Sequence, residues 1–342
     1  MVRGDSLYCP LPLSLDTYGN CLTDCWHCWV RFMNHVWDSE LKPLDLELFE
    51  KKLRNGLKNK NPKTPLAWGL AQKKTIRIGN KSDAFQEVEN EYGVTRKAMD
   101  ILLDMDWSFV IQTRFTANVM KSFDKLVQYP SLVTIMPVIS PGLDKDWELL
   151  ERGRTTPPLD RFKHLREFKR AGINVGVNGE PFIPGFHRIK DFVEALKLLK
   201  EYEIPSYNTY NLHFNAFTAK RLHAIGLDVE RIWYYNQDDQ WRKILKRLMV
   251  LSEKYGIKLG CPDFVNTGMK WKEPANTCCG VNVPNPCRFN THYFKRYYQL
   301  GKTPDEILRR ANDHMGDMET AKKIVYGKNC NLYTLRDIIK DK

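Results

Sequence analysis

Three cysteines stand close together near the start of the chain, at Cys21, Cys25 and Cys28. Their C-x3-C-x2-C spacing allows three thiolates to converge on one metal centre, and each iron of a [4Fe–4S] cluster takes a thiolate. Three local cysteines leave one iron with an open coordination position, which a catalytic metal centre needs. The triplet therefore predicts a catalytic [4Fe–4S] cluster.

Other uses of the same cysteines stay open. A zinc ion would need His27 or a distant cysteine as its fourth ligand, and His27 is badly placed because it adjoins Cys28. Haem attachment requires C-x-x-C-H, and Trp29 occupies the histidine position. A thioredoxin-like dithiol would use only two of the three thiols. The open iron–sulfur cluster is the favoured interpretation because it uses all three.

A second group of cysteines follows much later, within the stretch 261–287, which is rich in Gly and Pro and reads as a rigid loop. One interpretation is a structural zinc ion or an auxiliary iron–sulfur cluster. The other is a set of buried or substrate-facing cysteines without metal. Cys9 could complete either metal centre. The group consists of Cys261, Cys278, Cys279 and Cys287.

Composition bounds the class of protein. The chain has 342 residues, 42% of them hydrophobic and 27% charged, so it can build a large core and is not disordered by composition. It has no apolar run of transmembrane length and no apolar signal segment at its start. We therefore expect a cytoplasmic protein, with no membrane partner, whose nine cysteines stay reduced.

The charge is strongly basic, since 53 Lys and Arg against 41 Asp and Glu give a net charge of +12. Basic residues concentrate in 51–63 and 242–247, and Trp233, Tyr234 and Tyr235 stand near the second stretch. Such a surface attracts a polyanion, and interleaved aromatic rings suit stacking on unpaired bases. Solvated helix faces and an ordinary core explain the same residues equally well.

Apolar, β-branched runs alternate with helical patterns along the first two thirds of the chain, as βα units do. The strand-like runs are 75–79, 108–113, 132–139, 173–179 and 207–214. The helix-like segments are 44–57, 95–103, 118–128, 159–171 and 189–202. With one more unit near the N-terminus, they predict an α/β fold, a (β/α)6 partial barrel of TIM type or a doubly wound open sheet. In either fold, chemistry belongs at the carboxyl ends of the strands.

The alternation stops after residue 215. We expect residues 1–215 to form the partial barrel and 216–342 to form a mainly helical C-terminal extension that contains the 261–287 loop and packs across the barrel mouth. Helices are expected over 231–255 and over the last part of the chain.

The cysteine triplet, with an aromatic side chain immediately before its last cysteine, resembles the signature loop of the radical S-adenosylmethionine superfamily. The resemblance to this superfamily covers about residues 9–215. The resemblance implies that the amino and carboxylate groups of S-adenosylmethionine bind the open iron. It implies reductive cleavage to a 5′-deoxyadenosyl radical that takes a hydrogen atom from the substrate. It also implies a full or partial (β/α)6 barrel and an external electron donor of the flavodoxin or ferredoxin type.

Segments 76–85, 91–97, 111–114, 139–141 and 172–185, with Arg161 opening a helix, resemble the spore photoproduct lyase group, which includes DNA-repair enzymes that split a thymine dimer. The resemblance implies a lyase or isomerase type of enzyme. Its substrate would be a pyrimidine-derived base in DNA, or a related nucleotide, that is repaired, isomerised or modified.

The same resemblance implies contacts with S-adenosylmethionine. Carried over by position, Ser82, Arg114 and Ser140 fall where relatives contact this cofactor, each at the carboxyl end of a strand. Asn178 and Glu180 close the fifth strand and are candidates for its ribose or amino group. The structural interpretations are a turn cap for Ser82, a surface charge for Arg114 and a strand end for Ser140.

The chain departs from the lyase at two positions. Asn80 stands where the lyase has a cysteine that returns a hydrogen atom to the product radical, and asparagine has no weak S–H bond to give. The substrate radical would then rearrange, couple, or take hydrogen from another donor such as Cys9 or Cys330. Arg114 stands where relatives often have lysine, which keeps the charge and changes the hydrogen-bond geometry.

Two other functions stay open. One is a radical enzyme that acts on a peptide or a small metabolite, although the C-terminal cysteines do not match the twin-cluster pattern of many peptide-modifying relatives. The other is a non-catalytic, zinc-dependent module that binds nucleic acid.

Overall fold

The computed structural model describes residues 2–4, 11–32, 41–62, 64–261, 281–286 and 301–303, together with residues 306 and 309. Its main sheet contains five parallel strands that lie side by side in chain order. A further strand, β1 (Val2–Gly4), pairs antiparallel with the first of them. The parallel strands are β2 (Leu13–Leu15), β3 (Ile76–Ile78), β4 (Phe109–Ile111), β5 (Val133–Ile135) and β6 (Asn174–Val175).

A second parallel sheet continues this order. It contains β7 (Val177–Asn178), β8 (Ser206–Asn208) and β9 (Lys258–Gly260). The backbone N–H of Gly176, between β6 and β7, donates to the carbonyl oxygen of Ile135 (3.1 Å), and that of Ile139 donates to Asn178 (2.8 Å). The segment after β5 therefore runs beside β7, and the parallel arrangement extends to β9.

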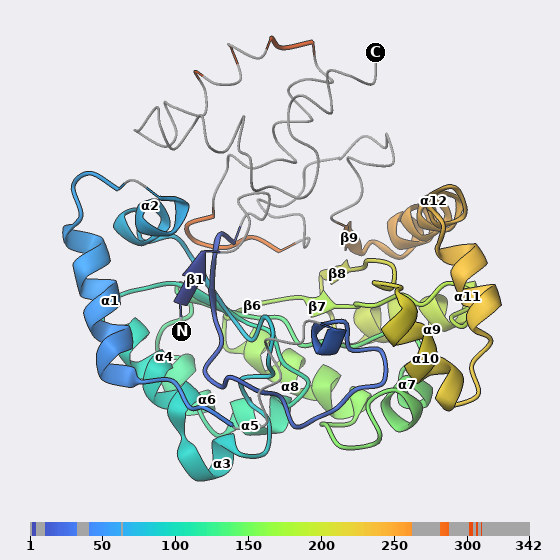
Figure 1. Ribbon diagram of the computed structural model, residues 1–342, viewed down its shortest axis with the longest axis horizontal. Helices are drawn as coiled ribbons and strands as arrows, with labels where there is room; N and C mark the ends of the chain where they lie inside the picture. The colour runs from blue at the N-terminus through green and yellow to red at the C-terminus, as the bar shows by residue number, and fades with distance from the viewer. Residues whose placement is uncertain are drawn as a thin grey trace.

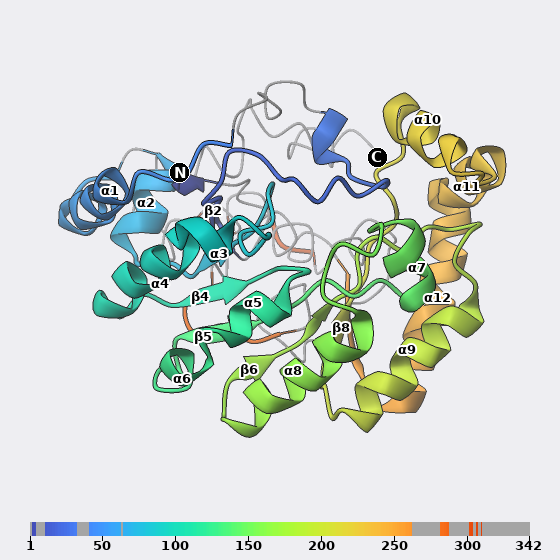
Figure 2. The same ribbon diagram turned by 90° about the horizontal axis from the view of Figure 1, so that it is seen from below.

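Helices follow the strands and lie in an arc around them (Figures 1 and 2). Local capping fixes where several begin: the Asp45 carboxylate accepts the N–H of Leu48 at the start of the first helix, and Asn215 caps another. The first six helices are α1 (Leu46–Lys58), α2 (Pro65–Ala71), α3 (Glu89–Tyr92), α4 (Val94–Asp104), α5 (Thr116–Met120) and α6 (Phe123–Leu126). The next six are α7 (Asp144–Leu149), α8 (Pro158–Arg170), α9 (Ile189–Glu201), α10 (Ala216–Ala224), α11 (Val229–Asn236) and α12 (Asp238–Tyr255), and a short 3-10 helix, η1, spans Val30–Phe32.

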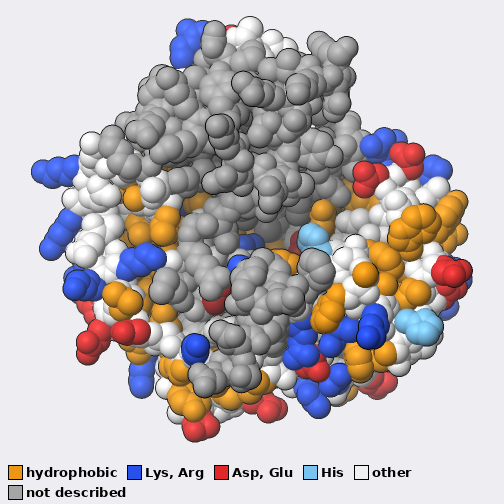
Figure 3. Space-filling view, viewed as in Figure 1, with side chains coloured by type: hydrophobic (Ala, Val, Ile, Leu, Met, Phe, Trp, Pro, Cys, Tyr) orange, Lys and Arg blue, Asp and Glu red, His pale blue; other side chains and the backbone are white. Residues whose placement is uncertain are grey.

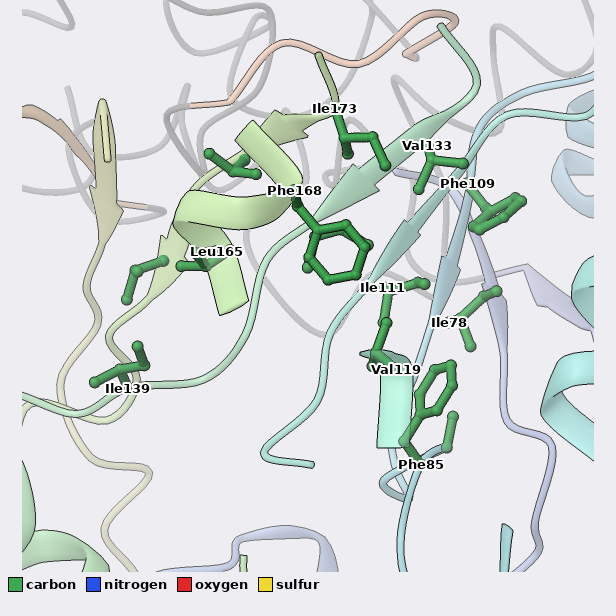
Figure 4. Packing of buried hydrophobic residues seen from close by; sticks show 14 of the residues in the cluster. Ile78, Phe85, Phe109, Ile111, Val119, Val133, Ile139, Leu165, Phe168 and Ile173 are labelled. Carbon is green, nitrogen blue, oxygen red and sulfur yellow. The ribbon is translucent and has the colours of Figure 1, made fainter. Parts of the chain in front are cut away.

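The main hydrophobic core lies between the strands and the helices. Alternate strand residues such as Ile76, Ile78 and Ile111 belong to it. Figure 4 shows Phe168 of α8 packed among these strand side chains, and its ring lies 5.2 Å from the ring of Phe123. The helices are therefore attached to the sheet mainly by apolar burial.

Residues 281–286 come from far along the chain and lie at the amino ends of the strands. The backbone of Asn285 pairs with Thr75, just before β3, at 3.0 and 3.1 Å, and its side chain accepts from Lys74 Nζ at 2.9 Å. Val281 and Val283 are buried in a small apolar cluster that includes Leu11, Val110 and Met136. This part of the extension lies away from the carboxyl ends, where packing across the mouth was expected.

The expected α/β class with a parallel sheet is confirmed, and the differences are local. The expected helix 118–128 divides into α5 and α6, and 231–255 divides into α11 and α12. The sheet continues past residue 215, because β9 pairs with β8. Most of residues 303–342 lie outside the described ranges. Among the helices that the structure describes, none has the length and apolar character needed to cross a membrane.

Replacing Phe168 with alanine should lower the free energy of unfolding by about 3–5 kcal/mol, because it leaves a cavity at a fully buried position. Urea denaturation followed by circular dichroism measures the change. Leu159→Ala is the matched control, since Leu159 lies on the same helix and is 43% exposed, and it should change stability by no more than about 0.5 kcal/mol. Equal effects of the two substitutions would contradict this description of the core.

Candidate functional site

The cysteine triplet lies in the loop that follows β2, at the carboxyl end of that strand. The side chain of Gln86, from the segment after β3, brackets the beginning of this loop. Its Oε1 accepts the N–H of Leu22 at 2.8 Å, and its Nε2 donates to the carbonyl oxygen of Asn20 at 2.8 Å. The Asn20 side chain in turn accepts the N–H of Cys21 at 2.7 Å. These bonds fix the backbone on which the first cysteine stands.

Asp24 is bound by three arginines in the middle of the loop. Its φ of +54° lies in the left-handed region, which aspartate tolerates better than most residues. Its carboxylate pairs with Arg31, with Arg152 at 3.1 Å and with Arg221 at 2.8 Å. Arg221, from α10, also donates to the carbonyl oxygens of residues 24–26 at 3.2–3.3 Å. The second cysteine therefore stands on backbone held by α10.

Trp26 anchors the loop to the body of the protein. Its backbone N–H donates to the carbonyl oxygen of Leu150 at 2.9 Å. The guanidinium carbons of Arg152 and Arg221 lie 4.3 and 4.8 Å from the centre of its ring, within cation–π distance. The ring thus packs between the loop and two side chains that also bind Asp24.

The three thiols form no disulfide, and Cys25 is buried while Cys21 and Cys28 are half-buried. Burial raises the pKa of the Cys25 thiol; Arg114 opposes this effect, and the neighbouring Glu151, Cys21 and Cys28 add to it. Burial also raises the pKa of Cys21. Three thiolates here need added positive charge, which fits the donor set of an iron–sulfur cluster.

The metal ligands remain a prediction. Among the described residues, no group of three or more His, Cys, Asp or Glu side chains is arranged to hold a metal ion. Of the later cysteines, Cys261 packs in the main hydrophobic core at 2% exposure. The other cysteines of that group, Cys278, Cys279 and Cys287, lie outside the described residues. The two alternative hydrogen donors, Cys9 and Cys330, lie outside them as well.

Asp16 joins the loops after β2 and β3. One of its carboxylate oxygens accepts the backbone N–H groups of Asn80, Lys81 and Ser82, at 3.1, 2.7 and 3.2 Å. The hydroxyl of Ser82 donates to the carbonyl oxygen of Tyr18 at 2.7 Å. Ser82 is therefore placed at the expected edge of the sheet, where its buried hydroxyl ties the two loops together.

Asp83 makes the corresponding connection between the loops after β3 and β4. Its carboxylate accepts the Thr113 hydroxyl at 2.5 Å and the backbone N–H groups of Arg114 and Phe85 at 2.8 and 3.1 Å. Burial raises the pKa of Asp83, and these hydrogen bonds oppose the shift. These hydrogen bonds fix the backbone of Arg114, and they therefore fix the point from which its side chain extends.

Glu151 lies between two arginines. Arg114 Nε is 3.1 Å from Glu151 Oε1, and the 1% exposed Arg161 pairs with Glu151 and donates to the backbone of Val138 and Thr156. Burial acts to raise the pKa of Glu151, but the two guanidinium groups outweigh it and hold this pKa below its ordinary value. The Arg114 side chain is therefore fixed by its ion pair with Glu151 and is not a free charge on the surface.

His27 contacts this pair on the side of the cysteine loop. Its Nε2 lies 3.2 Å from a terminal nitrogen of Arg114. Burial, followed by the charge of Arg114, lowers the pKa of His27 to about 3, so the imidazole is neutral near pH 7. A neutral ring accepts a hydrogen bond from Arg114 and adds no charge beside Cys28.

Ser140 lies in a second buried network, after β5. Its hydroxyl bonds to the Asp146 carboxylate, which also accepts the N–H of Gly142 at 2.9 Å and pairs with His187 Nε2 at 2.8 Å. Burial acts to raise the pKa of Asp146, and His187 and these donors outweigh it and lower it. Ser140 thus helps to fix the loop after β5 against the loop after β7.

Asn178 and Glu180 meet at the end of β7. Asn208, which ends β8, donates from Nδ2 to Asn178 Oδ1 at 3.1 Å and to Glu180 Oε1 at 2.6 Å. Burial raises the pKa of Glu180, while Asn208, Arg77 and Arg114 oppose the shift. The two predicted residues are therefore joined by a third, Asn208, that sequence reasoning missed.

All five predicted cofactor residues thus stand at the carboxyl ends of strands, and their roles toward a cofactor stay predictions. Sequence reasoning missed the side chains that connect them: Asp16, Asp146, Glu151 and Asn208. Asn208 lies at the second position of the expected strand 207–214, and no bounds were expected for the strand before Asp16, so the sequence did not indicate either residue. No signal in the sequence marks Asp146 or Glu151.

Comparison with known proteins identifies solved structures that share the fold of this chain. No family model matches the chain. The uncharacterized protein ORF301 of Acidianus two-tailed virus is 26% identical over 182 residues, which is 53% of this chain and 55% of that protein, so the chain matches about half of its relative. Spore photoproduct lyase complexed with dinucleoside spore photoproduct has a TM-score of 0.56 at 11% identity, covering 77% of this chain and 78% of that one. A point mutant of the lyase gives the same score and identity, covering 77% and 79%. The chain shares the fold of this lyase.

Glu151→Gln should lower the free energy of unfolding at pH 7 by about 3–5 kcal/mol, because it removes the anion from a buried ion pair. The folded pKa of Glu151 is depressed, so its stabilisation is present above the unfolded pKa of about 4.3 and is lost as pH falls through the lower folded value. Urea denaturation at pH 7 and at several acidic pH values measures both effects.

The matched control is Glu50→Gln, which removes an exposed partner of Arg54 and should cost about 0.5 kcal/mol or less. A difference between Glu151→Gln and the unsubstituted protein that stays constant from pH 7 to pH 3 would contradict the assignment.

Proposed function

We propose that this protein is a radical S-adenosylmethionine enzyme on a (β/α)6 partial barrel, in which Cys21, Cys25 and Cys28 hold a [4Fe–4S] cluster. One observation carries the proposal: the C-x3-C-x2-C loop stands at the carboxyl end of the first parallel strand, β2, in a fold shared with spore photoproduct lyase. The carboxyl edge of a parallel α/β sheet is where such folds bind ligands.

The groups of the chain that face the cysteines suit this role. When bound, the cluster and S-adenosylmethionine supply a 5′-deoxyadenosyl radical after one electron arrives from an external flavodoxin- or ferredoxin-type donor. Arg114 offsets the negative charge of Cys25 and Cys28, and Glu151 holds that guanidinium in place. Asp24 and Arg221 keep the loop backbone fixed.

The cofactor residues divide into two groups in this proposal. Arg114, Asn178 and Glu180 bring charged or amide groups to the edge, and these can pair with the carboxylate, ribose or amino group of S-adenosylmethionine. Ser82 and Ser140 act through the loops that their hydroxyls hold together. We propose direct contact with S-adenosylmethionine for the first three and positioning for the two serines.

We propose a pyrimidine-derived base in DNA as the substrate. Two observations support it: the lyase that shares this fold is known complexed with dinucleoside spore photoproduct, and this chain carries a net charge of +12. Asn80 stands where the lyase has its hydrogen-donating cysteine, so we favour isomerisation or modification of the base over simple repair.

Anaerobic reconstitution with iron and sulfide, followed by dithionite and S-adenosylmethionine, should give brown protein that releases 5′-deoxyadenosine. Alanine at any one of Cys21, Cys25 or Cys28 should abolish that release, because the cluster loses a ligand. Chromatography of the nucleoside and absorption spectra measure this. Cys261→Ala is the matched control: this cysteine is buried in the hydrophobic core, and the variant should keep the activity.

Three outcomes would contradict the proposal in distinct ways. Colourless protein with stoichiometric zinc would indicate the zinc-dependent module. Triplet variants that still release 5′-deoxyadenosine would exclude the cluster ligands proposed here. Deoxyadenosine release without any altered nucleoside in DNA, found by mass spectrometry, would exclude the DNA substrate and leave a peptide or metabolite.

A further inference from the structure

Three aromatic side chains form a row of neighbouring rings that runs from the cysteine loop to the segment after β8. Trp29 directly follows Cys28 and is 38% exposed. Its ring centre is 5.3 Å from that of His213, which is 5.3 Å from that of Tyr210, with interplanar angles of 46° and 49°. We call Trp29, His213 and Tyr210 the aromatic step. It connects the loop with the proposed cluster ligands to the carboxyl end of β8.

The backbone around the aromatic step is fixed on two sides. The carbonyl oxygen of Tyr210 accepts the N–H of Phe182 at 2.7 Å, two residues after Glu180. The carbonyl oxygen of His213 accepts the Thr218 hydroxyl at 3.2 Å, in the first turn of α10. The step is therefore attached to the loop with Glu180 and to the helix with Arg221.

Guanidinium groups bind the same loop that carries Trp29. Arg31, Arg152 and Arg221 all bind the carboxylate of Asp24, so three guanidinium groups meet at one point of the cysteine loop. The side chains of Arg152 and Arg221 are 26% and 15% exposed, so solvent reaches them. Figure 3 shows several Lys and Arg side chains gathered on this face of the molecule. A phosphate here would meet guanidinium groups, the side chains best suited to bind it.

A partly exposed ring on the same loop as several guanidinium groups offers a partner for each part of a nucleotide. Unstacked bases bind proteins by stacking on aromatic side chains, and their phosphates bind arginine. We propose that the aromatic step stacks an unpaired base of single-stranded or flipped-out DNA, with the adjoining phosphate on the arginines around Asp24. This inference rests on the nucleic-acid substrate proposed above and assigns it a binding site.

The test is binding of a fluorescein-labelled oligothymidylate to the reconstituted protein, followed by fluorescence anisotropy. Trp29→Ala should raise Kd about tenfold, because stacking on one base is lost, and Trp29→Phe should restore most of the affinity. Tyr92→Ala is the matched control, since Tyr92 is 44% exposed on α3 and should leave Kd and 5′-deoxyadenosine release unchanged. Trp233→Ala tests the other exposed tryptophan, which stands near the basic stretch 242–247. Affinity should also fall with added salt, as phosphate contacts require.

A second variant covers a failure of Trp29→Ala to fold. His213→Ala removes the neighbouring ring, which lies far along the chain from the cysteine triplet. This variant should also raise the Kd for oligothymidylate. Unchanged oligothymidylate binding in folded Trp29→Ala or His213→Ala would overturn the inference, as would a loss confined to Trp233→Ala. A raised Kd for S-adenosylmethionine alone would do so too, since it would assign the aromatic step to the cofactor's adenine.

Binding and catalysis fail separately in these experiments. The protein could bind oligothymidylate in a way that depends on Trp29 and yet never cleave S-adenosylmethionine. That outcome would support the aromatic step as a binding site and contradict the proposed enzymatic function. Cleavage of S-adenosylmethionine with binding indifferent to Trp29 and His213 would do the reverse.

Discussion

Buried carboxylates that accept hydrogen bonds from neighbouring loops hold the carboxyl edge of this sheet together. Asp16, after β2, binds the backbone after β3, and Asp83, after β3, binds the backbone after β4. Glu151 and Asp146, both after β5, bind Arg114 and His187 from two further loops. A buried carboxylate without donors costs several kcal/mol, so each loop must stay where its donors reach. The loops therefore form one connected surface.

The cysteine loop is attached to this connected surface at several points. Gln86 binds it from the segment after β3, Arg114 reaches His27 beside Cys28, and Arg221 holds it from α10. Because the groups on both sides are themselves fixed, the three thiols are presented by a rigid support and not by a free loop. Preorganisation of this kind suits a centre whose ligands carry like charges.

The elements that pack through apolar side chains were predictable from the sequence. The β-branched run at 108–113 gives β4, and the spacing of apolar residues at 159–171 gives α8. The strand β9 escaped because Lys258–Gly260 is short and its first residue is exposed, so it shows no apolar run. The expected helix at 118–128 divides at Lys121 and Ser122, where local bonds replace the continuous helical pattern.

The candidate site was only partly predictable. The spacing of three cysteines is local and needs no fold to be noticed. Glu151 matters because folding brings it to Arg114 and Arg161, at sequence distances of 37 and 10 residues, and no pattern announces such pairs. Ser82 and Ser140 were expected at the right edge, but whether a hydroxyl faces ligand or protein depends on its neighbours, which only the structure supplies.

The segment 281–286 has a consequence for synthesis on the ribosome. Leu11, Val110 and Met136 emerge early, yet their buried partners Val281 and Val283 emerge only after most of the chain has been made. Until then, these three side chains lack two of their buried partners. The packing of this cluster can therefore be completed only after residue 283 has been synthesised.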